Sequence, residues 1–288
     1  MIHLVYIPFR GVGIDNRNDE WFKERIEIFK NYTLKSLQNQ TTLDFTLWLS
    51  FRPEDEGSPL IQDIKKAIHW VNLRVVFTYD GLMYHDDKFG GSIANKIYNT
   101  ARILRRAWRN REIPTNPLLL FKDKNKTLPQ RLANSLKTLE KALPKSDTIL
   151  LTRIDSDDMF NKNALMRIKE IYEARESHAI TCDFGYIFNI ETRELAEYFP
   201  MTNPPFHTLA MPGGVFFNAE RHVSFYRGYK SHEDIKAQKF SMSSIGDWMY
   251  CVTTHNPKNH ISTTWNHPYR GRILTAEEKR VVLPSFGL

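Results

Sequence analysis

The sequence lacks the features that mark secreted, fibrous or membrane-spanning proteins. Its 288 residues include only two cysteines, Cys182 and Cys251, whose spacing matches no metal-binding motif. Both are expected to be reduced core residues, as in a cytoplasmic protein. No apolar run approaches the length of a membrane span, and residues 1–7 have no basic leader before them, so they are expected to form a buried strand. The chain also contains no internal repeat and no low-complexity tract.

The overall composition is that of a folded, basic protein. Hydrophobic residues make up 41% of the chain and charged residues 25%, which is ordinary for a globular protein. The formal net charge of +7 suits an anionic ligand, an anionic membrane face or nucleic acid. No nucleic-acid-binding motif is recognisable, and the aromatic residues are interleaved with expected core positions rather than with a basic stripe. A nucleic-acid partner is therefore not expected, although a nucleic-acid-binding protein stays an alternative.

Strand-like and helical patterns alternate along the first part of the chain, which predicts an α/β fold with a mostly parallel sheet flanked by helices. The expected strands cover residues 4–8, 44–51, 73–79 and 148–154, and the expected helices cover residues 21–37, 59–70, 92–108 and 163–175. Residues 109–145 interrupt this alternation and are expected to be an insertion with a helix at 129–143.

The later part of the chain has a different pattern, typical of an α+β arrangement. Residues 179–184 and 185–190 are expected to form a strand pair with a turn at 191–193, and residues 212–217 another strand. No linker divides the two parts, so residues 1–288 are expected to form a single domain. Its parts are a ligand-binding half (1–160), a second half (161–275) and a C-terminal tail (276–288).

Three carboxylates crowd the end of the strand expected at residues 148–154, namely Asp155, Asp157 and Asp158. In open α/β sheets, ligands bind at the carboxyl ends of the strands. Like charges this close repel each other unless a cation holds them, so replacing Asp157 by Ala is expected to keep or raise the stability of the metal-free protein. The crowding predicts a divalent-metal site at Asp155 and Asp157. The alternative is that these carboxylates only cap the next helix.

Other motifs that share some of these residue types do not fit. An EF-hand loop needs Asp or Asn where Met159 stands and Gly where Phe160 stands. A haloacid-dehalogenase-like phosphatase needs Thr or Val in place of Met159. Gly11 and Gly13 do not form a dinucleotide fingerprint, because Asn16 stands where the third glycine belongs.

The tetrad Asp155-Ser156-Asp157-Asp158 resembles the Asp-x-Asp motif of nucleotide-sugar glycosyltransferases with the GT-A fold. Inverting family 2 transferases often carry it between a strand and a helix, as here. Residues 32–41, followed by 44–49, resemble the family 2 opening, in which a helix ends in Ser-Leu-x-x-Gln before the second strand. Residues 90–96 resemble the family's Gly-to-Asn helix. Over roughly residues 1–270, the chain is most similar to the rhamnosyltransferase branch.

This resemblance implies a GT-A fold, which is Rossmann-like, with an α+β acceptor-side half. In that fold the first-strand loop and the end of the third strand hold the nucleotide, which implies Arg10 for a phosphate and Asp80 for the base. Asp157, with help from Asp155, would hold Mn²⁺ or Mg²⁺, and Asp155 could contact the ribose instead. Many relatives add a late histidine, which here is His267. The alternatives are that Arg10 is a surface charge, that Asp80 is a turn residue, and that His267 is a polar residue satisfied by its neighbours.

An inverting mechanism implies a catalytic base near the acceptor. Gly246-Asp247-Trp248 is similar to the family's Glu-Asp-Trp segment, with Gly in place of Glu, which makes Asp247 the candidate. Asp234 is the competitor, and a solvated surface is the alternative for its charged surroundings. The arginines within residues 102–111 are expected to form a solvated helix end or a peripheral membrane contact.

The sequence therefore predicts a metal-dependent, inverting glycosyltransferase located in the cytoplasm. It would move a sugar from a nucleotide-sugar donor to a hydroxyl of a glycan, a lipid-linked acceptor or a protein. Two alternatives remain. A sugar nucleotidyltransferase would need a better phosphate loop than residues 9–13 provide, and a basic nucleic-acid-binding protein would use the positive charge.

Overall fold

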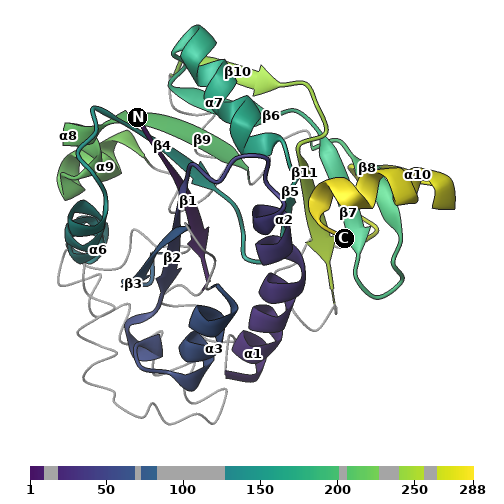
Figure 1. Cartoon of the computed structure of the whole chain (residues 1–288), viewed down its shortest axis with the longest axis horizontal. Coiled ribbons are helices and arrows are strands. Elements are labelled where there is room, and N and C mark those ends of the chain that lie inside the picture. Colours follow the sequence, from purple (N-terminus) through teal and green to yellow (C-terminus); the bar gives the residue numbers. More distant parts are fainter. Residues whose placement is uncertain (10–18, 69–72, 83–126, 201–205, 227–239, 256–264) are drawn as a thin grey trace, which may run out of the picture.

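The structure is a computed structural model that describes residues 1–9, 19–68, 73–82, 127–200, 206–226, 240–255 and 265–288 (Figure 1). The predicted α/β fold with a mostly parallel sheet is confirmed. In the described part of the chain the main sheet has seven strands, and only β9 runs antiparallel to its neighbours. Their order is β10 (Met242–Ile245), β6 (Ala179–Cys182), β9 (His207–Pro212), β4 (Thr148–Arg153), β1 (Ile2–Pro8), β2 (Thr46–Phe51) and β3 (Arg74–Tyr79).

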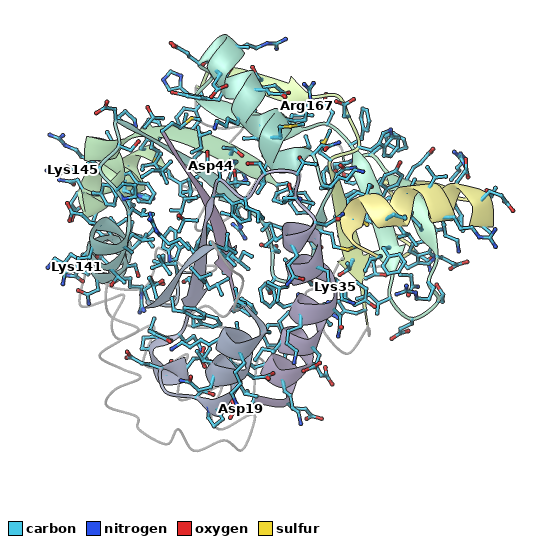
Figure 2. All side chains as sticks on the ribbon, viewed as in Figure 1. Asp19, Lys35, Asp44, Lys141, Lys145 and Arg167 are labelled. Carbon is cyan, nitrogen blue, oxygen red and sulfur yellow. The ribbon has the colours of Figure 1, made fainter. Side chains whose placement is uncertain are left out.

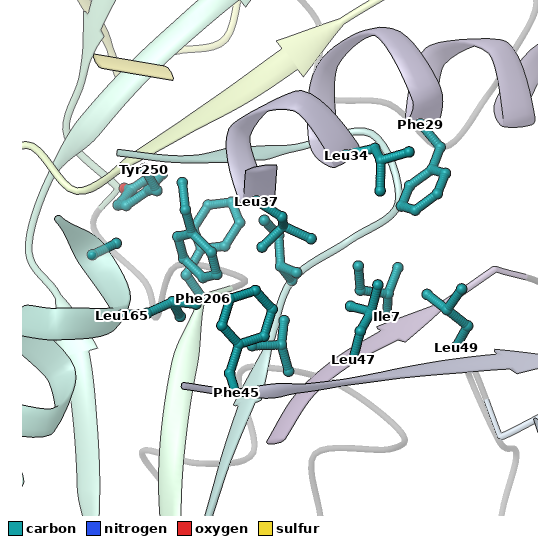
Figure 3. Packing of buried hydrophobic residues seen from close by; sticks show 14 of the residues in the cluster. Ile7, Phe29, Leu34, Leu37, Phe45, Leu47, Leu49, Leu165, Phe206 and Tyr250 are labelled. Carbon is teal, nitrogen blue, oxygen red and sulfur yellow. The ribbon is translucent and has the colours of Figure 1, made fainter. Parts of the chain in front are cut away.

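One face of this sheet is covered by the N-terminal helices. Alternate residues of a strand point to opposite faces, and Ile7, Leu47 and Leu49 point towards Phe29 and its helical neighbours (Figure 3). The helices on this side are α1 (Asp19–Ile28), the π-helical η1 (Phe29–Thr33), α2 (Leu34–Gln38) and α3 (Pro59–Ala67), with the short η2 (Pro53–Asp55) after β2. This arrangement confirms the predicted helix at residues 21–37 and fixes α1 over the carboxyl end of β1.

The opposite face carries a second core. Leu4, Tyr6 and Trp48, which alternate with the residues above, pack with buried residues of α6 (Leu128–Ala142) and α8 (Gly213–Phe216), and partly buried residues of α9 (Ala219–Phe225) cover this cluster. Burial on both faces explains why the parallel strands are almost continuously apolar. Helix α6 begins with a capping box made by Thr127 and Gln130, which confirms the helix expected at residues 129–143.

A second sheet lies beside the first (Figure 1). Its order is β12 (Arg270–Ile273), β8 (Leu195–Tyr198), β7 (Gly185–Asn189), β11 (Tyr250–Thr254) and β5 (Met159–Phe160). The C-terminal helices α10 (Ala276–Val282) and η4 (Leu283–Phe286) pack against it through Phe286 and its neighbours. Helix α7 (Ala164–Arg175) contacts β6 and β10 at the border of the two sheets.

The structure corrects two predictions for the later half. The expected pair of residues 179–184 with 185–190 is wrong, because β6 and β7 belong to different sheets and β7 pairs with β8. The expected strand at 212–217 is also wrong, because the strand ends at Pro212 and residues 213–216 form α8. The expected helix at 92–108 and residues 109–126 of the insertion lie outside the described residues.

Charged side chains cover the outside of the molecule. Lys141, Lys145 and Arg167, labelled in Figure 2, project away from the main sheet. A few charged side chains are buried instead, and these point to a functional site. They include Arg25 and Asp157, which lie at the carboxyl ends of the parallel strands. In the described part of the chain, no helix is long and apolar enough to cross a membrane.

Candidate active site

The acidic motif forms a tight turn at the carboxyl end of β4. Pairing with β1 continues past the strand, because Ile154 N donates to Tyr6 O at 3.1 Å, and Asp158 N then donates to Asp155 O at 3.2 Å to close the turn. The carboxyl ends of β1, β2 and β3 lie at the same edge, since all four strands are parallel. The turn therefore faces the edge at which ligands bind in open α/β sheets.

Asp157 is buried and is held by two basic side chains. Arg25, from α1, forms an ion pair with its Oδ2 through Nη1. His255, directly after β11, donates from Nε2 to the same Oδ2 at 3.0 Å. Burial acts to raise the pKa of Asp157, but the charge of Arg25 and the hydrogen bond from His255 outweigh it and hold that pKa well below its usual range. Asp157 is therefore a carboxylate at neutral pH.

Asp158 has a structural role in the same turn. Its Oδ1 accepts a hydrogen bond from Thr253 N at 3.0 Å, and Thr253 Oγ1 donates to Asp157 O at 2.6 Å, so the turn is tied to β11. Burial, and then the charges of Asp157 and Asp155, raise the pKa of Asp158 well above its usual value. Asp158 therefore holds the turn against β11, and β11 in turn brings His255 to Asp157.

Asp155 is less buried than its neighbours, with 18% of its side chain exposed. The buried Arg153 donates to its Oδ1 from Nη2 at 3.1 Å and from Nε at 3.3 Å. This double contact fixes the orientation of the carboxylate. Asp155 is thus presented at the edge of the site.

Asp80 lies after β3, at the far end of the same sheet edge. Its Oδ1 accepts hydrogen bonds from Ser50 Oγ at 2.7 Å and from Leu82 N at 3.2 Å. Burial raises the pKa of Asp80 to about 7, although these hydrogen bonds and the charge of Arg131 act to lower it. Its Oδ2 is buried and has no hydrogen-bond partner among the described residues. Three strand spacings separate β3 from β4, which places Asp80 roughly 14 Å from the acidic turn.

The chemistry of Asp157 and His255 suits a divalent metal. Two neighbouring ligands of an octahedral ion with bonds of about 2.1 Å lie about 3.0 Å apart, and Oδ2 and Nε2 are separated by 3.0 Å. The described residues contain no group of three or more His, Cys, Asp or Glu side chains that could hold a metal. Further ligands would therefore come from a bound phosphate and water, as is usual for Mg²⁺.

Among the described residues, His267 has no hydrogen bond or ion pair with the acidic turn. Its ring packs against Tyr198 and Tyr269, at centroid distances of 5.5 and 4.8 Å, and its Nδ1 accepts a hydrogen bond from Tyr269 N at 3.3 Å. The histidine beside Asp157 is instead His255. Arg10, predicted to face a phosphate, and Asp234, the competing base, lie outside the described residues.

Asp247 also lies away from the acidic turn. It precedes β11, whereas Thr253 and His255, which contact the turn, lie at the other end of that strand. The six positions between Asp247 and Thr253 correspond to as much as roughly 20 Å of extended chain. The Asp247 side chain is 58% exposed, and its carboxylate is 3.7 Å from Arg167 Nη2. Its assignment as the catalytic base stays a prediction.

Sequence reasoning missed Arg25 and His255. The signal for Arg25 was its place on the buried stripe of an amphipathic helix, one turn after Trp21 and next to Ile26. The signal for His255 was its position directly after the apolar run 250–254, as Asp155 follows the run 148–154. Arg25 is thus a charged residue at a position where the helical pattern predicts burial, and His255 is a polar residue at a predicted strand end.

Comparisons with known proteins agree with the resemblance noted in the sequence. Residues 17–76 match the family model described as "Putative rhamnosyl transferase", so the predicted likeness to the rhamnosyltransferase branch is confirmed over this segment. The segment runs from the start of α1 into β3 and includes Arg25. No curated protein matches the chain.

Similar solved structures include the Staphylococcus aureus protein TarS. A crystal structure of TarS residues 1–349 with UDP-GlcNAc has a TM-score of 0.43 and 12% identity, and the match covers 89% of this chain and 59% of that one. The complex of the same fragment with UDP has a TM-score of 0.40 and 11% identity, covering 88% and 61%. The match therefore spans less than two thirds of these TarS chains.

Proposed function

We propose that this chain is a glycosyltransferase that takes a sugar from a nucleotide-sugar donor and transfers it to an acceptor hydroxyl. One observation carries the proposal. A buried carboxyl group, Asp80, and a buried carboxylate–imidazole pair, Asp157 with His255, stand at two ends of one edge of a parallel sheet. A nucleotide base and a diphosphate need such groups, and the match of residues 17–76 to a rhamnosyltransferase model supports this choice.

The donor would lie along the carboxyl edge of the sheet. Asp80 Oδ2 would accept a hydrogen bond from an N–H of the base, because its Oδ1 is already occupied by Ser50 and Leu82. Asp155, partly exposed and fixed by Arg153, would accept from a ribose hydroxyl. Asp157 and His255 would stand at the diphosphate end.

A divalent ion, Mn²⁺ or Mg²⁺, fits between Asp157 Oδ2 and His255 Nε2. When bound, it would supply Lewis-acid stabilisation of the negative charge on the leaving diphosphate. In this proposal His255 has the role that the sequence resemblance implied for His267. Exchanging each histidine for Ala separates the two assignments, because His255→Ala should weaken Mn²⁺-dependent donor binding and His267→Ala should not. The opposite result would restore the assignment of His267.

The proposed reaction is inverting, with Asp247 as the predicted base for the acceptor hydroxyl. The carboxylate of Asp247 is exposed, and as the base it would have to come within hydrogen-bond reach of the hydroxyl that attacks the anomeric carbon.

Calorimetric titration separates these functions. UDP-, dTDP- and GDP-sugars, nucleoside triphosphates and an oligonucleotide would be titrated with and without Mn²⁺. We expect one class of nucleotide-sugar to bind in a Mn²⁺-dependent way, with affinity lost in Asp157→Asn. Tight binding of a triphosphate with no nucleotide-sugar binding would favour the nucleotidyltransferase, and tight binding of the oligonucleotide alone would overturn the proposal.

A further inference from the structure

Arg25 is an unusual residue for its position in α1. Only 4% of it is exposed, and its guanidinium lies 5.0 Å from the ring centroid of Trp21, one helical turn earlier. Cation–π contact of this kind holds an arginine in place. Its Nη1 contacts Asp157 Oδ2, while its Nε is buried with no hydrogen-bond partner among the described residues. The side chain therefore lies within the site and has one hydrogen-bond donor, Nε, that no described residue uses.

The atom that Arg25 contacts is the atom proposed as the metal ligand. Asp157 Oδ2 receives both Arg25 and His255. A divalent cation entering between Asp157 and His255 would meet the positive charge of Arg25 in a buried setting, where like charges repel strongly. Arg25 thus neutralises Asp157 while no metal is bound and makes it a poorer metal ligand.

A diphosphate would reverse this competition. A guanidinium has five N–H donors in a planar fork that matches phosphate oxygens, and it prefers bidentate contact. Arg25 offers such donors, including its buried Nε. A diphosphate bound beside Asp157 would therefore attract Arg25 away from the carboxylate and leave Oδ2 to the metal.

From this geometry we infer that Arg25 is a resident cation that competes with the divalent metal for Asp157 and transfers to the donor diphosphate, so that metal and nucleotide bind cooperatively. The inference rests on the proposed function, since it needs a metal and a diphosphate at this site. It goes further in giving a residue of α1 control over the order of binding. Coupling between two ligands is reciprocal, so each should strengthen the binding of the other by the same factor.

The test measures Mn²⁺ binding by electron paramagnetic resonance of free Mn²⁺, with and without a nucleoside diphosphate. UDP, dTDP and GDP would be compared first, and the one that binds best with Mn²⁺ would be used. In the wild-type protein we expect it to tighten Mn²⁺ binding by about tenfold or more. In Arg25→Gln, Mn²⁺ alone should bind on the order of tenfold more tightly than in wild type, and the gain from nucleotide should fall to about twofold.

Two further variants test whether the effect depends on the position of the positive charge and on the guanidinium group. Lys30→Gln removes one positive charge from the same helical region, where Lys30 pairs with Glu27 and Asp63, and it should behave as wild type. Arg25→Lys keeps the charge but lacks the bidentate fork, so Mn²⁺ alone should still bind weakly while part of the coupling to nucleotide is lost. Equal Mn²⁺ affinity of wild type with and without nucleotide would overturn the inference without any variant.

The outcomes also separate this inference from the proposed function. If neither Mn²⁺ nor any nucleotide binds the wild-type protein, both fail. If both ligands bind together but Arg25→Gln shows the wild-type affinities and coupling, the role of Arg25 fails and the proposed function stands.

Discussion

Replacing Asp157 by Asn should destabilise the metal-free protein, which reverses the expectation from sequence. Clustered carboxylates alone suggest that removing one relieves repulsion. In the structure, however, Asp157 is 12% exposed and pairs with Arg25, whose side chain is 5% exposed. Removing the carboxylate leaves a buried guanidinium without its counter-charge. Breaking a buried pair in this way costs about 3–5 kcal/mol.

For a chain of this size, about 1 kcal/mol lowers Tm by roughly 2–4 °C, so Asp157→Asn should melt roughly 6–20 °C below wild type. Circular dichroism melts in buffer with a chelator would measure this. Asp44→Asn is the matched control, because Asp44 is 80% exposed and pairs with Lys169 at 3.1 Å, and an exposed pair contributes at most about 1 kcal/mol. Arg25→Gln added to Asp157→Asn should recover part of the loss. Melting of Asp157→Asn at or above the wild-type temperature would refute the buried pairing.

Three other predictions follow from single residues. Asp80 ionises through a pKa of about 7, so lowering the pH from 8 to 6 should reduce calorimetric affinity for the donor nucleotide roughly tenfold, because the protonated form loses its acceptor. Asp80→Asn should remove that pH dependence, and an unchanged profile in the variant would exclude Asp80 as its source. Gly213→Ala would press a methyl group against the Ser146 carbonyl oxygen, whereas a methyl at Gly214 has nothing within 4 Å. Urea unfolding should show a loss of about 1–3 kcal/mol for the first and under about 0.5 kcal/mol for the second, and equal losses would contradict this packing. Asp247→Asn should lower transfer roughly 10²–10⁴-fold with unchanged donor affinity, and normal transfer would remove Asp247 as the base.

The parallel sheet could be predicted from sequence because its signal is local. Runs such as 148–154 are apolar throughout, as expected for strands covered on both faces, and helical stripes separate them. Segments governed by tertiary contacts were predicted wrongly. Val215 and Phe216 have the β-branched and aromatic character of a strand, but residues 213–216 form α8, with Gly213 close to the Ser146 backbone.

In the candidate site, too, residues with a local sequence signal could be predicted, and residues brought in by tertiary contacts could not. Asp155 and Asp157 could be assigned because they are neighbours in one turn, and Asp80 because it ends a predicted strand. His255 is 98 residues from Asp157, and Arg25 comes from the first helix, so nothing local pairs either of them with the motif. Which histidine meets Asp157 is decided by the pairing of β11 with β5, which places Thr253 and His255 beside the turn.

Hydrolysis of nucleotide-sugars tests the central claim most directly. UDP-, dTDP- and GDP-sugars would be incubated with the protein, with and without Mn²⁺, and release of the nucleoside diphosphate would be measured. The proposed function predicts release from one donor class that requires Mn²⁺ and is lost in both Asp157→Asn and His255→Ala, while His267→Ala stays active. Undiminished release by folded Asp157→Asn and His255→Ala, or the absence of binding and release for every donor tested, would contradict it.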